Sequence, residues 1–192
     1  MTIFRYGVAL GILASFLYGC AQEPSFRGTA LDPPRETRDF TLRDQLGKPV
    51  RLSDFRGRVV ILTFLYTACR DVCPLVTAKL RKAREMLGEV APRAVFLAVT
   101  TDPTRDTVKR VRAYSEKYQM LDRWHFLTGE RPILQPIWKY YWVGKVWTDK
   151  EGNVMHQAPV HLIDRAGKIR VAYGSGFEPA DLAEDIRILL RG

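Results

Sequence analysis

Two closely spaced cysteines carry the most specific chemistry in this sequence. Cys69 and Cys73 are separated by three residues, Arg70-Asp71-Val72, and are followed by Pro74. Paired thiolates can exchange with disulfides or bind a soft metal ion such as Cu(I). A disulfide that closes so short a loop would stabilise a fold little, which argues against a purely structural role. The pair therefore predicts redox exchange or soft-metal binding.

The sequence around the pair indicates the elements that position it. The apolar run 59–66 has the length and β-branched content of a buried strand. Pro74 suits the first position of a helix, so we expect Cys73 at the N-cap and Cys69 in the loop before it. Both sulfurs would then lie near the positive end of the helix dipole, which favours thiolates. This predicted helix stops near Gly88, and its apolar residues recur at helical spacing: Val76, Leu80, Ala83 and Leu87.

Composition indicates a single globular domain with an excess of basic residues. The chain has 192 residues, of which 46% are hydrophobic and 27% charged, and its formal net charge is +9. The basic residues are scattered over predicted helices, which is typical of solvated faces, with a docking patch for anionic lipid or an acidic partner as the alternative. No nucleic-acid-binding motif accompanies the charge, so we expect no nucleic-acid partner.

The N-terminus has the features of an export signal. Residues 6–19 follow Arg5, contain no charge and have the length of a signal-peptide core. Leu17-Tyr18-Gly19-Cys20 resembles the bacterial lipobox, in which the cysteine is lipidated after cleavage. We therefore predict a signal peptide over 1–19, then a lipidated Cys20 with a proline-containing tether over 20–37. The folded domain, 38–192, would lie on the periplasmic side of a bacterial membrane; an uncleaved N-terminal membrane anchor is the alternative.

The order of the remaining elements predicts an α/β domain. Parallel strands need a crossover, and strand, helix and strand follow one another here at the spacing of a right-handed βαβ unit. The order matches a thioredoxin-like fold with an N-terminal β-hairpin extension and an insertion before the last hairpin. Further expected elements are a hairpin at 39–42 and 49–52, a strand at 94–99, a helix opening at Asp102 and Pro103, a strand at 124–127, an interrupted helix at 130–141, a hairpin at 160–164 and 169–173, and a helix from Pro179.

A third ligand for a metal at the cysteine pair has to come from one of three histidines. Cu(I) accepts two thiolates and one imidazole, whereas zinc usually takes four ligands and no further cysteine is available. We expect His125 to be a partly exposed strand residue and His161 a buried, hydrogen-bonded residue of an apolar strand. His156 lies three residues before Pro159, on the approach to the penultimate strand. In thioredoxin-like folds that approach faces the cysteine helix, which makes His156 the preferred candidate.

Taken as an ordered set, these motifs resemble those of the Sco/SenC copper-binding proteins of cytochrome c oxidase assembly. The resemblance spans roughly residues 40–190, and its motifs are Cys69–Pro74, Asp102–Thr107, Leu127–Gly129 and His156. It implies a membrane-tethered thioredoxin-like domain that binds copper, as Cu(I) and as a second option Cu(II). Carried over, Cys69, Cys73 and His156 become the copper ligands, and Asp102 and Asp106 become supporting residues that shape the site.

The resemblance also implies partners and leaves two roles open. The copper-site subunit of cytochrome c oxidase would be the target, with other copper chaperones or a thiol reductant as further partners. The protein would deliver copper or, as a redox pair of Cys69 and Cys73, reduce the cysteines of the target. A peroxidase of the peroxiredoxin type is weakened because its Pro-x-x-x-Thr-x-x-Cys pattern is absent around both cysteines. A module that only mediates interactions is the remaining alternative.

Four positions depart from the family pattern. Arg70 stands where proline is frequent, and a cation beside thiolates should lower their pKa. Met155 stands where an aspartate often precedes the histidine, which removes an attraction for a cation. Pro159 and His161 occupy positions expected to be apolar or aromatic. Pro159 would bring the local geometry nearer to a redox thioredoxin, which keeps the reductase hypothesis open.

Overall fold

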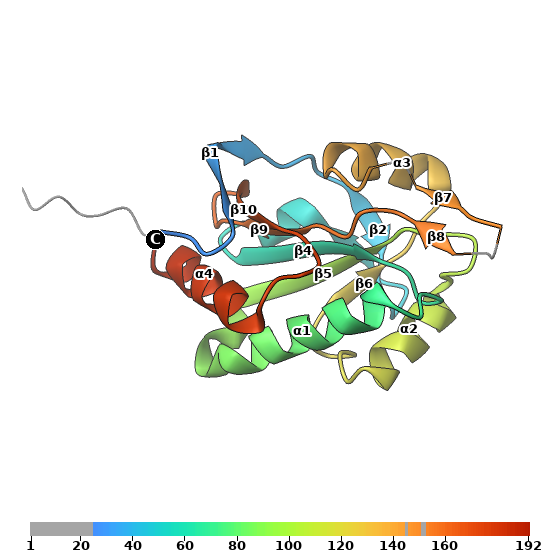
Figure 1. Ribbon diagram of the computed structural model, residues 1–192, viewed down its shortest axis with the longest axis horizontal. Coiled ribbons are helices and arrows are strands. Elements are labelled where there is room, and N and C mark those ends of the chain that lie inside the picture. The colour runs from blue at the N-terminus through green and yellow to red at the C-terminus, as the bar shows by residue number, and fades with distance from the viewer. Residues whose placement is uncertain (1–24, 145, 151–152) are drawn as a thin grey trace, which may run out of the picture.

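A six-stranded mixed sheet forms the centre of the domain in the computed structural model, which describes residues 25–144, 146–150 and 153–192 (Figure 1). The strand order is β1-β10-β9-β4-β5-β6. Strands β4, β5 and β6 are parallel, β9 is antiparallel to β4, and β10 is antiparallel to both β9 and β1. The strands are β1 (Thr29–Glu36), β4 (Val59–Leu65), β5 (Ala94–Thr100), β6 (His125–Leu127), β9 (Val160–Ile163) and β10 (Lys168–Tyr173).

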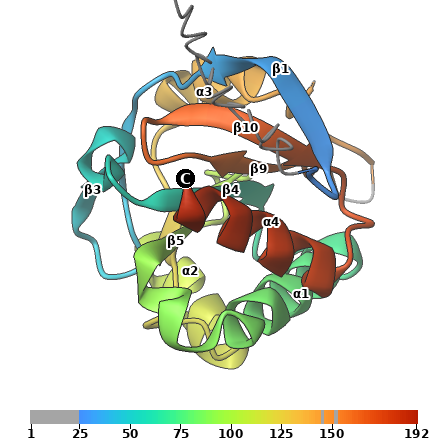
Figure 2. The ribbon, with the colours of Figure 1, turned by 90° about the vertical axis from the view of Figure 1, so that its left-hand side faces the viewer.

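Helices cover both faces of this sheet, and Figure 2 shows the layers end-on. Every residue of β4 and β5 is buried, because apolar side chains from both faces of these strands pack against a covering layer. The helices α1 (Val72–Met86), α2 (Val108–Lys117) and α4 (Pro179–Arg191) pack on one face. On the other face lie α3 (Arg131–Tyr140), the hairpin of β2 (Thr41–Arg43) and β3 (Pro49–Arg51), and the 3-10 helix η1 (Leu52–Phe55). A second 3-10 helix, η2 (Gly88–Arg93), follows α1.

This architecture confirms the thioredoxin-like α/β fold. The β4-α1-β5 unit has parallel strands, as the two apolar runs predict. The β2–β3 hairpin is the predicted N-terminal extension. The predicted insertion contains α3 and a small hairpin of β7 (Trp147–Thr148) and β8 (Val154–Met155), which together precede β9.

Two helices begin at other residues than the sequence predicts. Helix α1 begins at Val72 with Asp71 as N-cap, so Cys73 lies in its first turn instead of at the N-cap. Helix α2 begins at Val108, and its N-cap is Thr107, whose hydroxyl accepts from the Arg110 amide. The expectation of an N-cap at Asp102 is therefore wrong. The segment 101–106 forms turns, and its Asp106 carboxylate accepts hydrogen bonds from Thr67 and Thr100, as described below.

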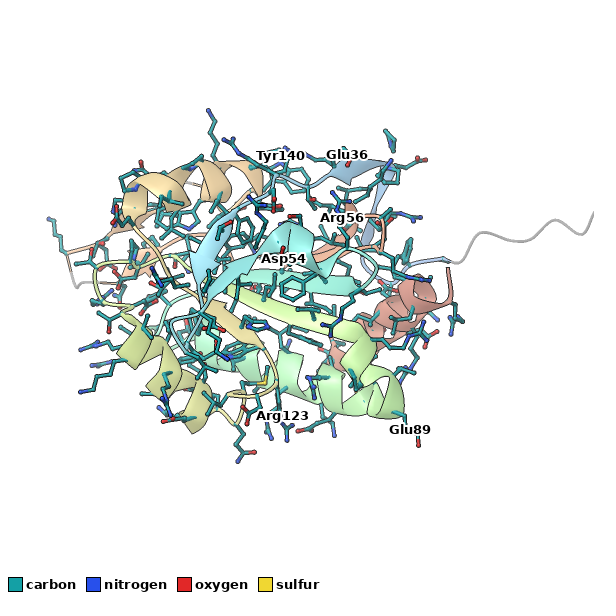
Figure 3. The ribbon with its side chains drawn as sticks, turned by 180° about the vertical axis from the view of Figure 1, so that it is seen from behind. Glu36, Asp54, Arg56, Glu89, Arg123 and Tyr140 are labelled. Atoms are coloured by element: carbon teal, nitrogen blue, oxygen red, sulfur yellow. The ribbon has the colours of Figure 1, made fainter. Side chains whose placement is uncertain are left out.

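The expected tether over 20–37 is too long by at least the length of β1. Thr29–Glu36 forms an edge strand paired with β10, and the buried Asp185 carboxylate of α4 accepts hydrogen bonds from the amides of Arg27 and Gly28. The Tyr140 hydroxyl of α3 also donates to the Glu36 carbonyl, beside which it lies in Figure 3. These bonds use the backbone, whereas the side chains of β1 are mostly exposed, so the segment has no apolar pattern from which a strand could be predicted.

The N-terminal predictions lie outside the described residues. These are the signal peptide at 1–19 and the lipidation site at Cys20. Within the described ranges, no helix is both long enough and apolar enough to cross a membrane.

Candidate metal and thiol site

The cysteine pair lies directly after the carboxyl end of β4. Cys69 is half-buried in the loop. Cys73, in the first turn of α1, is 1% exposed, and its side chain packs in the core between α1 and the sheet. Both are free thiols, and the amide of Cys73 donates to the Cys69 sulfur over 3.4 Å. A sulfur that accepts a helix-terminal N–H is stabilised as a thiolate. The geometry therefore gives the two cysteines unequal roles, with Cys69 on the accessible side.

The proton equilibria of the pair are correspondingly unequal. A hydrogen bond from the Cys73 thiol lowers the pKa of Cys69 to about 5, against the opposing effect of burial. The same bond, together with burial, raises the pKa of Cys73 far above its ordinary value. Cys69 is thus a thiolate at neutral pH and Cys73 a protonated donor to it. This arrangement favours nucleophilic attack by Cys69 and soft-metal binding at the same atom.

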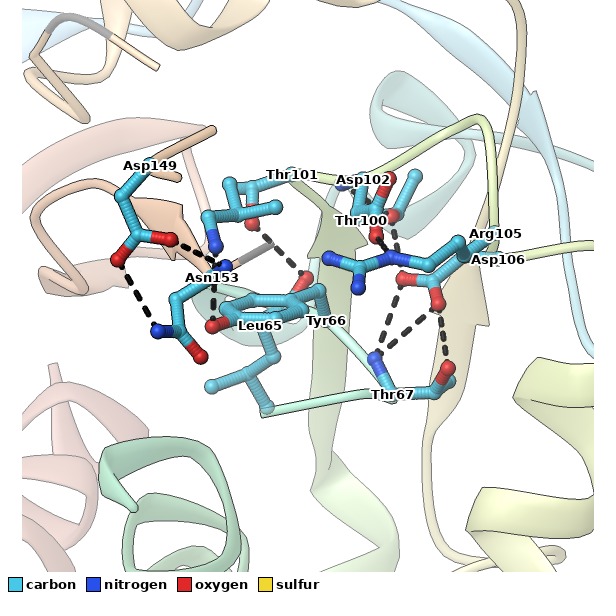
Figure 4. Close-up of polar contacts among 11 residues, drawn as sticks. Leu65, Tyr66, Thr67, Thr100, Thr101, Asp102, Arg105, Asp106, Asp149 and Asn153 are labelled. Carbon is cyan, nitrogen blue, oxygen red and sulfur yellow. Dashed lines mark hydrogen bonds and ion pairs between the residues drawn. The ribbon is translucent and has the colours of Figure 1, made fainter. Parts of the chain in front are cut away.

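Tyr66, the residue after β4, connects the cysteine loop to the segment that carries His156. Its hydroxyl accepts a hydrogen bond of 3.2 Å from the Val154 amide of β8 (Figure 4). Its ring centre lies 5.7 Å from that of the His156 imidazole, edge to face, and 5.8 Å from the Arg105 guanidinium. Burial and the neighbouring Cys69 raise the pKa of Tyr66 to about 12, so the hydroxyl stays protonated.

The two aspartates expected to support the site hold the loops that follow β4 and β5. The buried Asp106 carboxylate accepts from the Thr67 amide at 3.1 Å, the Thr67 hydroxyl at 2.5 Å and the Thr100 hydroxyl at 2.6 Å (Figure 4). Burial raises the pKa of Asp106 despite these bonds. Asp102 pairs with Arg105, whose guanidinium lies over the Tyr66 ring. Asp106 thus fixes the start of the cysteine loop directly, and Asp102 acts through Arg105.

His156 shares a cavity of about 700 Å³ with both cysteines. It follows β8 and is half-buried, and its Nδ1–H donates to the Gln157 carbonyl at 2.6 Å. That bond leaves the lone pair on Nε2, which is the form that binds metals. Burial lowers the pKa of His156, which also keeps the ring neutral.

Cys69, Cys73 and His156 do not form a metal-binding cluster in the part of the chain that the structure describes. Among the described residues, no cluster of three or more His, Cys, Asp and Glu side chains is close enough to hold a metal ion. Cys69 and Cys73 lie together, and His156 lines the same cavity without forming such a cluster with them.

Comparison with known proteins gives the family of this chain. The profile of the SCO1/SenC family matches residues 28–191, which is most of the chain. The chain belongs to the SCO1/SenC family. The SCO1 protein homolog of Bacillus subtilis (strain 168) is 26% identical over 189 residues, which cover 94% of each chain.

Solved structures agree with this assignment. A SCO1/SenC family lipoprotein from Bacillus anthracis str. Ames aligns with a TM-score of 0.77 at 26% identity, covering 86% of this chain and 99% of that one. The structure of BsSco, described with a disulfide switch and as a member of the Sco family of cytochrome c oxidase assembly proteins, aligns with a TM-score of 0.71 at 25% identity. That alignment covers 83% of this chain and 95% of the other.

The other two histidines of this SCO1/SenC chain have the structural roles that their positions predict. His125 lies on β6, is partly exposed, and its Nδ1 is 3.2 Å from Asp44. His161 is fully buried on β9, and its Nε2–H donates to the Tyr141 carbonyl at 2.9 Å. Burial lowers the pKa of His161 to about 4, so the ring is neutral. Its Nδ1 has no hydrogen-bond partner among the described residues.

Sequence reasoning missed Tyr66 and the two threonines that bind Asp106. Tyr66 stands at the end of the apolar run and reads as its last strand residue, although its hydroxyl bonds to the histidine segment. Thr67 and Thr100 follow or end buried strands and carry short hydroxyl side chains, which are common at strand ends. The available signal is positional, because residues just beyond the carboxyl ends of parallel strands are where α/β folds place their chemistry.

Proposed function

We propose that this chain is a lipid-anchored, extracytoplasmic copper-binding protein that assists assembly of the dinuclear copper centre of cytochrome c oxidase. Cu(I) is its cargo, and Cys69, Cys73 and His156 are the ligands. One observation carries the proposal. A Cys69 thiolate lies against the Cys73 thiol in a cavity that the neutral His156 imidazole also lines.

The chemistry of this donor set supports Cu(I) over harder ions. Thiolate and imidazole ligands in a small number favour Cu(I), which accepts trigonal coordination. Copper binding would displace the proton of Cys73, since a metal binds the thiolate form. The Nδ1–H bond of His156 to Gln157 would orient Nε2 as the third donor. Membership of the SCO1/SenC family supports the oxidase copper-site subunit as the target, with another copper chaperone as a source of the ion.

Two features support the proposed extracytoplasmic location of the protein: its N-terminal sequence and a structural relative. Leu17-Tyr18-Gly19-Cys20 has the pattern of a lipidation site, and a structural relative is a lipoprotein. The thiols of such a domain face an oxidising compartment, so the cysteine pair needs a thiol reductant before it can bind Cu(I).

A second candidate function is a thiol–disulfide oxidoreductase that reduces the copper-site cysteines of the oxidase. The unequal cysteines favour it, because Cys69 is an accessible nucleophile and Cys73 a buried thiol placed to resolve a mixed disulfide. Pro159 precedes β9 and lines the same cavity. This function needs no copper and no histidine ligand.

Reconstitution with the purified copper-site domain of an oxidase distinguishes the two functions. The full chain in a non-ionic detergent is given Cu(I) and mixed with the reduced apo domain, and the absorption of the copper centre is followed. The metal-free reduced chain is separately mixed with the oxidised domain, and target thiols are counted. We expect the His156→Ala variant to lose copper transfer and to keep thiol reduction. Reduction by the wild-type chain without any transfer of copper would replace the proposal with the oxidoreductase.

A further inference from the structure

A second cavity opens onto Cys69 from the side of helix α2. It has a volume of about 700 Å³ and shares Cys69 and Arg70 with the cavity that His156 lines. One wall is the cysteine loop, and the other is a face of α2 that includes Arg110, Ala113 and Lys117. We call this cavity the α2 groove. Cys69 therefore lines two separate cavities on the surface of the molecule.

The α2 groove carries positive charge that the described residues leave uncompensated. Arg70, Arg110 and Lys117 line it and are exposed, and no described Asp or Glu is among its lining residues. None of the three forms an ion pair within the described ranges, whereas the neighbouring Arg112 is paired with Glu116 at 3.0 Å. Cations gathered around one cavity raise the local concentration of an anionic ligand and steer its approach.

We propose that the α2 groove docks an acidic segment of the protein partner that exchanges copper or electrons with Cys69. The inference rests on the proposed function for the nature of that exchange, but docking itself requires neither copper nor a redox step. A partner chain lying in the groove would have its own thiols beside the Cys69 sulfur. The His156 side of that sulfur would remain free.

The arrangement of the molecule favours a protein segment over an anionic membrane surface. The described chain starts beside the C-terminus at one end of the long axis, and the N-terminus of α1 and helix α2 lie at the other end (Figure 1). A chain anchored through its N-terminus would therefore hold the groove at the end far from the anchor. The groove also includes Cys69 in its lining, and a polypeptide can present thiols there whereas lipid headgroups cannot.

One cation of the groove lies in the cysteine loop. Arg70 is exposed and lines both cavities, so the groove carries positive charge on the cysteine loop as well as on α2.

Peptide binding to the reduced, metal-free full chain in a non-ionic detergent tests this proposal. The probe is a fluorescent glutamate-rich peptide, compared with the same peptide carrying glutamine. We expect the glutamate peptide alone to bind, with an affinity that falls as salt is raised toward physiological strength. The Arg110→Glu/Lys117→Glu variant should bind it about tenfold more weakly or worse. Both substitutions lie on exposed positions of α2, so the core is unchanged.

A matched control separates the groove from net charge. Lys82→Glu/Lys139→Glu makes the same change of charge at exposed positions of α1 and α3 that do not line the groove, and should leave peptide affinity within about twofold. The bound peptide should also slow alkylation of Cys69 by a neutral reagent in the wild-type chain and in this control variant, but not in the groove variant.

Three outcomes would overturn the inference. These are equal binding of the glutamine peptide, equal loss of affinity in the control variant, or a peptide that binds without protecting Cys69. Loss of binding to phosphatidylglycerol vesicles in the groove variant, with peptide binding intact, would instead make the surface a membrane face. Cu(I) affinity is measured separately on the same variants. A chain that docks the peptide but does not bind Cu(I) would refute the proposed function and leave the docking inference standing.

Discussion

At the scale of single residues, the Cys69 sulfur should react as a thiolate well below neutral pH. Its pKa is about 5, so the nucleophilic form is present above that value and is lost as pH falls through it. We expect the rate of alkylation by iodoacetamide to rise through pH 5 and to stay flat up to neutral pH. The rate is read by mass spectrometry of the modified peptide. An inflection near the ordinary thiol value of about 8.5 would contradict the hydrogen-bonded arrangement of the pair.

Tyr66→Phe removes one hydroxyl and keeps the ring that packs against His156. That hydroxyl hydrogen-bonds to Cys69, which lowers the pKa of the thiol, and it accepts from the Val154 amide. We expect the alkylation profile of Cys69 to move to higher pH and the Val154 amide to exchange hydrogen faster, as measured by NMR.

Tyr114→Phe is the matched control for this change. It removes a buried hydroxyl that bonds to Thr77 at 2.9 Å within the core. This variant should leave both the alkylation profile and the exchange of Val154 unchanged. If Tyr66→Phe also changes neither quantity, Tyr66 does not connect the two parts of the site.

At the scale of elements, Asp106 ties the loop after β4 to the loop after β5. Asp106→Ala would leave the Thr67 amide and the hydroxyls of Thr67 and Thr100 without their acceptor. We expect the free energy of unfolding to fall by about 2–5 kcal/mol, measured by urea denaturation. Asp122→Ala, at an exposed position, should cost less than about 0.5 kcal/mol. Equal midpoints for the two variants would show that Asp106 does not hold the loops.

Asp185 has the equivalent role at the N-terminal end of the domain. Its buried carboxylate accepts from the amides of Arg27 and Gly28 and from the Tyr173 hydroxyl. Asp185→Ala should lower the free energy of unfolding by about 2–4 kcal/mol and increase hydrogen exchange in β1. Exchange in β1 that stays as slow as in the wild-type chain would contradict this anchoring.

The elements differ in how far the sequence predicts them, and the reason is physical. Strands β4 and β5 are continuous apolar runs because both of their faces are covered, so the pattern identifies them. Strand β1 is held through its backbone and leaves its side chains exposed, so no pattern marks it. Helix α2 starts at Val108 and not at Asp102, and the Asp106 carboxylate before it accepts hydrogen bonds from Thr67, 39 residues away. Contacts between distant residues thus decide what local rules leave open.

At the scale of the whole molecule, the site is assembled from three separate segments. The cysteine loop follows β4, the aspartate loop follows β5, and the histidine segment joins β8 to β9. The types and spacing of Cys69 and Cys73 nominate them from sequence, and the family resemblance adds His156 as a candidate. The sequence does not reveal that His156 faces the shared cavity without joining the cysteines in a ligand group. The position of His156 relative to the cysteines depends on how the insertion packs, and no local sequence pattern predicts how an insertion packs.

The measurement that tests the central claim most directly is a Cu(I) titration of the reduced full chain against a competing chelator. We expect one copper per chain, bound by Cys69, Cys73 and His156. His156→Ala should weaken binding by about tenfold or more, which corresponds to about 1.4 kcal/mol or more. His125→Ala, which replaces a histidine bonded to Asp44, should bind as the wild-type chain does. Weak binding by the wild-type chain, or equal affinity of His156→Ala and wild type, would contradict the account.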